Sequence, residues 1–134
     1  MTPPEDRANG TADAPGRSPA VSFCVIEKRA DFLKAASAGR QGTPGFLLQA
    51  RDRQDGQPMV RIGLTASKKI GNAVLRNRAK RRLRALAHKM LRPEARSGWD
   101  YVLVARPEAT VARSFADLCS DLATALRQVH RGKT

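Results

Sequence analysis

Apolar side chains recur along this chain with two different periods, and these periods predict a small domain of strands and helices. Residues 46–51 and 60–66 alternate between apolar and polar positions, which is typical of strands with one buried face. Residues 100–106 hold an unbroken apolar run, which favours an interior strand covered on both faces. Asp55 and Gly56 lie between the first two segments and predict a hairpin that pairs them.

Three other segments repeat their apolar side chains at helical spacing. A short helix is predicted over residues 29–38 and ends at Gly39, because glycine tolerates the left-handed conformation that closes many helices. A long helix over residues 72–91 ends before Pro93, and a last helix begins at the capping residue Ser114. The predicted order is α-β-β-α-β-α, which gives an α+β two-layer sandwich, a small sheet packed by helices.

Size and composition favour one folded domain behind a disordered leader. The chain has 134 residues, 41% of them hydrophobic, which allows a single modest core. Residues 1–20 hold several prolines and few apolar side chains, so we expect a disordered leader there and one domain over residues 21–134. No secretory signal pattern opens the chain, and no apolar run approaches the roughly 18 residues of a membrane span. We therefore expect a cytoplasmic protein with reduced cysteines.

The charge of the chain changes this picture from a generic domain to one that binds a polyanion. Lys and Arg number 25 against 12 Asp and Glu, which gives a formal net charge of +13. Nucleic acid is the default partner of such a chain, and an anionic membrane surface is the other candidate. Between residues 56 and 93 there is no acidic residue but there are eleven basic ones: Arg61, Lys68, Lys69, Arg76, Arg78, Lys80, Arg81, Arg82, Arg84, Lys89 and Arg92.

On a helical wheel the long predicted helix divides into a narrow apolar stripe and a broad basic surface. The stripe consists of Leu75, Ala79, Leu83, Leu86 and Met90 and is expected to dock on the sheet. The basic side chains cover most of the remaining circumference, with repeats at four-residue spacing. Such like-charge pairs cost a few tenths of a kcal/mol each (about 0.2–0.5), a repulsion that bound phosphates relieve.

The run over residues 63–84, GLTASKKIGNAVLRNRAKRRLR, closely resembles the signature of the bacterial ribonuclease P protein component. Its Arg-Asn-Arg motif matches residues 76–78 here, and the resemblance extends over about residues 27–130. It implies that family's fold, an α/β sandwich with a left-handed βαβ crossover. That hand follows from the resemblance only, because parallel crossovers are right-handed in about 98% of cases.

The resemblance also implies a role in transfer-RNA maturation. The family's protein joins a catalytic RNA, and the holoenzyme removes the 5′ leader of precursor tRNA by metal-dependent hydrolysis. The RNA carries that chemistry, so the resemblance predicts no catalytic residue, no metal ligand and no cofactor on the protein alone, with Mg²⁺ expected in the holoenzyme. The expected partners are the catalytic RNA and the precursor leader, not DNA or a membrane.

Two groups of site residues are expected. The leader cleft, between the first helix and the sheet, is expected to include Phe32, Phe46 and Gln49. Two positions that are often aromatic in the family are Ala36 and Gln49 here, so the cleft is expected to rely more on polar and phosphate contacts. The expected RNA-binding residues are Arg61, Lys68, Lys69, Arg76, Asn77, Arg78, Lys80, Arg81, Arg82 and Arg84.

Three other functions fit parts of the same sequence. A ribosomal-type structural RNA-binding protein has a similar composition, and only the signature run distinguishes the two. A DNA-binding module would read bases from the major groove, for which Asn77 alone is thin support. A free-standing nuclease would need a carboxylate cluster; Asp117 and Asp121 share a helix face but are better explained as capping and surface charges.

Overall fold

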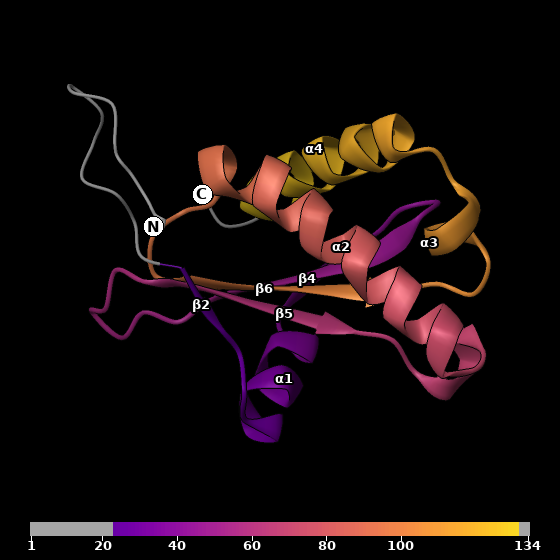
Figure 1. The fold of residues 1–134 in the computed structure, drawn as a ribbon. Helices are drawn as coiled ribbons and strands as arrows, with labels where there is room; N and C mark the ends of the chain where they lie inside the picture. Colours follow the sequence, from indigo (N-terminus) through magenta and orange to yellow (C-terminus); the bar gives the residue numbers. More distant parts are fainter. Residues whose placement is uncertain (1–22, 132–134) are drawn as a thin grey trace, which may run out of the picture.

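The structure is a computed structural model that describes residues 23–131 (Figure 1). The expected leader over residues 1–20 lies outside the described residues and stays a prediction. The elements are β2 (Phe23–Val25), α1 (Arg29–Ala36), β3 (Gly39–Gly42), β4 (Phe46–Asp52), β5 (Val60–Thr65), a 3-10 turn (Lys68–Ile70), α2 (Ala73–Glu94), β6 (Trp99–Ala105), α3 (Ala109–Ala112) and α4 (Phe115–Arg131).

The strands form one mixed sheet with the order β2-β5-β6-β4-β3. β5 runs parallel to both β2 and β6, whereas β4 runs antiparallel to β6 and β3. The interior place predicted for the strand at residues 100–106 is confirmed, since β6 is the middle strand and is buried on nearly every residue. The α+β class is confirmed as well.

The predicted hairpin between β4 and β5 is wrong. β6 lies between these two strands, so neither pairs with the other. The connecting loop is closed by a side chain instead: the Arg53 guanidinium donates to the carbonyls of Gln57 and Met59 at 3.3 and 2.8 Å. A turn signal in the sequence thus marked a reversal of direction, not a strand pair.

Other element boundaries also differ from the predictions. α1 ends at Ala36, and Gly39 opens β3, an edge strand that was not predicted. α2 continues through Pro93 to Glu94, and the backbone N–H of Ala95 still donates to the carbonyl of Leu91 at 2.7 Å, although Pro93 itself has no N–H to donate. The short helix α3 was not predicted. Ser114 does cap α4, accepting the backbone N–H of Asp117 at 3.1 Å.

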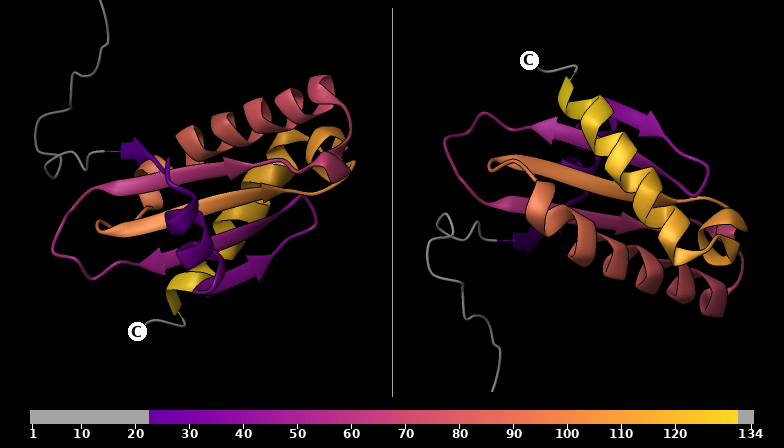
Figure 2. Two further views of the ribbon diagram at one scale, coloured as in Figure 1. Left: turned by 90° about the horizontal axis from the view of Figure 1, so that it is seen from below. Right: turned by 90° about the horizontal axis from the view of Figure 1, so that it is seen from above.

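Helices cover both faces of the sheet (Figure 1). α2 and α4 lie side by side on one face, as the view from above in Figure 2 shows, and they enclose the main core around Phe46, Leu83 and Leu122. α1 lies alone on the opposite face over a small second cluster of Ile26, Ala35 and Val102. The two-layer prediction therefore omitted a third, smaller layer.

A buried histidine at the end of α4 makes the stability of the fold depend on pH. His130 is 8% exposed, and its Nε2 lies 2.7 Å from the hydroxyl of Tyr101, which accepts the backbone N–H of Arg96. Burial, assisted by repulsion from Arg96, lowers the pKa of His130 from 6.5 to about 4. Burial also raises the pKa of Tyr101 to about 12, so the phenol stays protonated and can donate to the neutral imidazole.

We expect this histidine to destabilise the protein as pH falls from 6.5 towards 4. In that window the unfolded chain binds a proton at this position and the folded chain does not, so the free energy of unfolding falls by up to about 1.4 kcal/mol per pH unit. Urea unfolding of His130→Gln and of the unchanged protein at several pH values would measure the difference. The substitution should remove this part of the slope.

Candidate nucleic-acid interface

The apolar stripe predicted for α2 docks on the sheet as expected. Ala79, Leu83 and Leu86 are fully buried, and Leu75 and Met90 are half-buried against the same core. Ala87 and Leu91 are buried too, so the docked face is wider than the stripe. The rest of the helix surface is free to carry charge.

The start of α2 is built by two side-chain caps. Asn72 caps the helix, its Oδ1 accepting the backbone N–H of Leu75 at 3.0 Å, and the Ser67 hydroxyl accepts the N–H of Lys69 in the turn before it. Gly71 joins the two with a φ of 137°, a backbone conformation that other residues rarely adopt. The exposed Lys68 and Lys69 are therefore held just ahead of the helix.

The solvent side of α2 is a basic surface up to Arg92, and the one acid of the helix, Glu94, lies in its last turn. Among the described residues, no Asp or Glu forms an ion pair with a Lys or Arg of this helix. We call this surface the α2 ridge. Its exposed members are Lys68, Lys69, Asn77, Arg78, Arg81, Arg84, Lys89 and Arg92, and Arg76 and Lys80 are half-buried at its flank.

Arg82 does not belong to the ridge, although it was expected to bind RNA. Its side chain turns inward and its Nε donates to the carbonyl of Thr110 at 2.9 Å. It also donates to the carbonyl of Arg113. These carbonyls lie at the C-terminal end of α3, so Arg82 fastens that segment to α2. Arg82 is therefore a structural residue.

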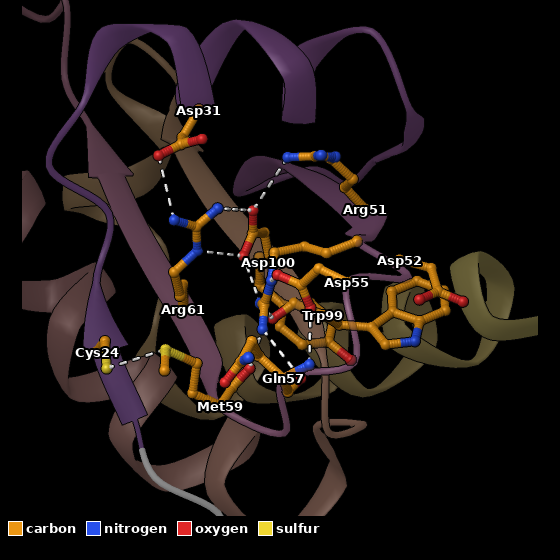
Figure 3. Close-up of polar contacts among 12 residues, drawn as sticks. Cys24, Asp31, Arg51, Asp52, Asp55, Gln57, Met59, Arg61, Trp99 and Asp100 are labelled. Carbon is orange, nitrogen blue, oxygen red and sulfur yellow. Dashed lines mark hydrogen bonds and ion pairs between the residues drawn. The ribbon is translucent and has the colours of Figure 1, made fainter.

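Arg61 was also expected to bind RNA, and it too is committed to contacts within the fold (Figure 3). Its guanidinium donates to both carboxylate oxygens of Asp100, at 2.8 and 2.7 Å, and to Asp31 of α1 at 3.1 Å. The hydrogen bonds that Arg61 donates to Asp100 and Asp31 raise its pKa further above its already high value. Arg61 therefore links α1 to the sheet.

Asp100 is the centre of a cluster of arginines at this end of the sheet. The carboxylate is completely buried, and it also accepts a hydrogen bond of 2.8 Å from Arg53. Arg51 lies at 3.6 Å from it, too far for a hydrogen bond. In Figure 3 the guanidinium groups of Arg51 and Arg61 converge on this one carboxylate from β4 and β5, the strands on either side of β6. We call these four residues the Asp100 cluster.

The three residues expected in a leader cleft are not brought together. Phe46 is fully buried in the main core, on the face covered by α2 and α4, so its place in the cleft is wrong. Gln49 is half-buried on the opposite face, in register with Val102 under α1. Phe32 is half-buried at the edge of α1 and packs so closely that a Cβ on Gly63 would lie 2.5 Å from its ring.

The structure contains a pocket that the sequence did not predict, with a cavity volume of about 370 Å³. We call it the β2 pocket, because it lies at the sheet edge formed by β2 and β5. Its apolar walls are Phe23, Val25, Ile26, Phe32, Ile62 and Leu64. Its basic wall comes from α2, where Lys80, Arg84, His88 and Arg92 follow one another at four-residue spacing. This four-residue spacing is the feature of the sequence that could have predicted the basic wall of the pocket.

The described part of the chain has neither a metal-binding cluster nor a membrane span. No group of three or more His, Cys, Asp or Glu residues within residues 23–131 is placed to share a metal ion. No helix in that range is long and apolar enough to cross a bilayer. The features that stand out are the α2 ridge and the β2 pocket beside it.

The chain has relatives among known proteins that align over most of its length. The family model described as Ribonuclease P matches residues 23–130. The ribonuclease P protein component of Ruegeria pomeroyi is 52% identical over 122 residues, covering 86% of this chain and 98% of the relative. That of Gluconacetobacter diazotrophicus is 49% identical over 104 residues, covering 77% and 88%.

Solved structures agree with the sequence relatives. The RNase P protein of Staphylococcus aureus superposes with a TM-score of 0.62 at 26% identity, covering 77% of this chain and 92% of that chain. The RNase P protein from Thermotoga maritima gives 0.65 at 22% identity, covering 78% and 96%, and supports the fold alone. The chain therefore belongs to the ribonuclease P protein family, the protein subunits of a ribonucleoprotein endoribonuclease in tRNA processing.

Proposed function

We propose that this protein binds the catalytic RNA of ribonuclease P through the α2 ridge and assists removal of the 5′ leader from precursor tRNA. The observation that carries the proposal is a helix surface rich in Arg and Lys without a single acidic partner among the described residues. Uncompensated cations on a rigid helix match the regular phosphates of a structured RNA, and binding them releases counterions. The mature 5′ end of the tRNA is the product of this reaction.

The residues proposed to contact the catalytic RNA are those of the ridge between Lys68 and Arg84. Arginine predominates among them, and its planar guanidinium can donate two hydrogen bonds to one phosphate. The proposal leaves out Arg61 and Arg82, whose donors are used inside the fold. It comprises Lys68, Lys69, Arg76, Asn77, Arg78, Lys80, Arg81 and Arg84.

For the precursor leader, we propose a path along the α1 side of the sheet. Phe32 is half-buried at that face and offers part of an aromatic ring, and Gln49 offers an amide from the sheet. With Ala36 in place of a second aromatic residue on α1, a leader bound there depends on polar and phosphate contacts more than on stacking. We also propose that the crossover from β5 through α2 to β6 is left-handed. The hand of this crossover determines which flank of α2 lies beside the edge of the sheet.

Mg²⁺ is proposed to be held by the RNA and not by this protein. Mg²⁺ prefers oxygen ligands, whereas the solvent side of α2 presents cationic nitrogens, so these residues do not fit the ion. No step of the protein's action is derived through the metal. The place of action proposed for the complex is the cytoplasm.

Cleavage of precursor tRNA at low Mg²⁺, with and without the catalytic RNA, tests the proposed function. We expect no cleavage by the protein alone and faster cleavage when protein and RNA are combined, because the ridge supplies positive charge that the ions otherwise provide. Cleavage by the protein alone would contradict the proposal. Binding to the RNA without any acceleration would favour a structural RNA-binding protein instead.

A further inference from the structure

We propose that Asp31 and Gly63 are positioning residues: together they fix the distance between α1 and the sheet, and they act on the leader without touching it. The inference rests on the proposed function, because it starts from a leader that lies along the α1 side of the sheet. Two contacts carry it, an ion pair from the first turn of α1 and an aromatic ring packed on a glycine of β5. We call these two contacts the α1 seat.

α1 is too short to be stable without the rest of the fold. It has eight residues, whereas isolated helices shorter than about 12–15 residues are marginal in water. Its N-cap residue Lys28 makes no side-chain capping hydrogen bond, and Ala35 is its one buried residue, in a small cluster with Ile26 and Val102. The position of α1 therefore depends on the few contacts that it makes with the sheet.

The polar contact of the seat joins Asp31 to an arginine that is already fixed on the sheet. Nη1 of Arg61 donates to Asp31 at 3.1 Å, while its Nε and Nη2 are bound to the buried Asp100 (Figure 3). Among residues 23–131 this is the one ion pair that a side chain of α1 makes. The side chains of Arg61 and Asp31 are only 22% and 17% exposed, so solvent screens this pair less than an ordinary surface pair.

A glycine makes the apolar contact of the seat possible. Gly63 of β5 is in register with Val102 of β6 on the α1 face, and the ring of Phe32 lies directly against it. A Cβ at this position would lie 2.5 Å from Cε1 of that ring, so a larger residue would displace the ring. The two contacts are adjacent, because Arg61 and Gly63 are two residues apart on β5 and point to the same face.

The α1 seat sets the spacing between the two groups that we propose for the leader. Phe32 is carried by α1, whereas Gln49 is carried by β4, where it is in register with Val102. An RNA strand that contacts both groups depends on the distance between helix and sheet, and a binding site has to be held within about 0.5 Å of its productive geometry. Asp31 is an acid beside a path for phosphates, so its charge opposes binding and its benefit comes from position.

The measurement is the affinity of the assembled holoenzyme for precursor tRNA with a long leader and with a one-nucleotide leader. Asp31→Ala should weaken binding of the long-leader substrate about fivefold, although it removes a charge that repels phosphate. Binding of the short-leader substrate and the cleavage rate at saturating substrate should not change. Charge alone predicts the opposite sign, so unchanged or tighter binding of the long leader would overturn the proposal.

Two further variants separate position from charge. Gly63→Ala keeps the net charge and moves the Phe32 ring away from β5, so it should weaken long-leader binding by a similar factor. Asp117→Ala removes an acid from the exposed first turn of α4 and should leave the ratio of the two affinities unchanged. A loss in Asp31→Ala without a loss in Gly63→Ala would overturn the shared role of the two contacts.

Hydrogen exchange in the free protein distinguishes a displaced helix from a damaged fold. In Asp31→Ala the amides of α1 should exchange faster, whereas those of β6 should not, because Asp100 keeps its hydrogen bonds from Arg53 and Arg61. Faster exchange throughout the sheet would indicate a general structural role and overturn the positioning role.

The two substrates also separate this proposal from the proposed function. If the unchanged holoenzyme bound both substrates equally, the leader role itself would fail. If it preferred the long leader, and Asp31→Ala and Gly63→Ala both kept that preference, only the α1 seat would fail.

Discussion

Replacing Arg78 and Arg81 together with alanine should weaken binding to the catalytic RNA by about one to two orders of magnitude at moderate salt. Both side chains are exposed on the α2 ridge, and neither donates a hydrogen bond to another described residue in the structure. Their loss therefore removes contacts to RNA and not contacts within the fold. Alanine is the best helix former, so α2 itself should be unaffected.

The salt dependence of binding distinguishes this effect from a general loss of charge. Each phosphate contact contributes about 0.7–0.9 to the slope of log affinity against log salt, so the double variant should have a slope lower by about 1.5. Lys34→Ala with Arg127→Ala removes the same charge from exposed positions on α1 and α4 and serves as the control. An unchanged slope in the ridge variant would mean that these arginines are not at the interface.

Arg82→Ala completes the comparison, because Arg82 lies in the same basic run but faces inward. It should leave the salt slope unchanged and lower the free energy of unfolding by about 1–3 kcal/mol, through loss of the donors that hold the carbonyls of Thr110 and Arg113. A reduced slope in Arg82→Ala would return this residue to the interface.

The second large effect is expected at Asp100, where substitution by asparagine should lower the free energy of unfolding by about 3–5 kcal/mol. The carboxylate is fully buried and receives hydrogen bonds from Arg53 and Arg61, with Arg51 nearby. Asparagine keeps the size of the side chain but removes the negative charge on which three arginines converge. Among the described residues, Arg61 then keeps only Asp31 as an ion-pair partner, and Arg53 keeps only Asp55.

Urea unfolding would measure this change, with Asp117→Asn as the control. Asp117 is exposed at the start of α4, so its substitution gives the same change in net charge without disturbing a buried pair. A loss of stability no larger for Asp100→Asn than for Asp117→Asn would contradict the central role of Asp100. Since Arg61 also binds Asp31, we expect hydrogen exchange in α1 to increase in the Asp100 variant.

Local pattern in the sequence was sufficient for the strands and for the docked face of α2. β4 and β5 fall within one residue of their predicted ends, since alternation over six or seven residues is a strong signal. Pairing was not predictable in the same way, because no local feature indicates that β6 inserts between two strands joined by a turn. β3 has the sequence Gly-Arg-Gln-Gly, which carries no apolar pattern, and its strand form depends on β4.

The misplaced site residues have physical reasons that differ from one another. Phe46 and Gln49 are three positions apart on one strand, so the alternation itself places them on opposite faces of the sheet. This odd spacing can be counted in the sequence, and it excludes a cleft that contains both side chains. The inward orientation of the Arg82 side chain could not be predicted from the sequence, because it depends on the position of α3. The contacts of Arg61 likewise depend on Asp31 and Asp100, 30 and 39 residues away along the chain.

The central position of β6 also bears on how the chain folds during its synthesis. Until Ala105 has left the ribosome, the described strands can form only the β3–β4 and β2–β5 pairs, which are two separate halves of the sheet. α2 precedes β6, so its apolar stripe is complete before the strand that unites its docking surface exists. We therefore expect slow folding limited by long-range strand pairing, with a nascent chain that displays its RNA-binding helix before its core has closed.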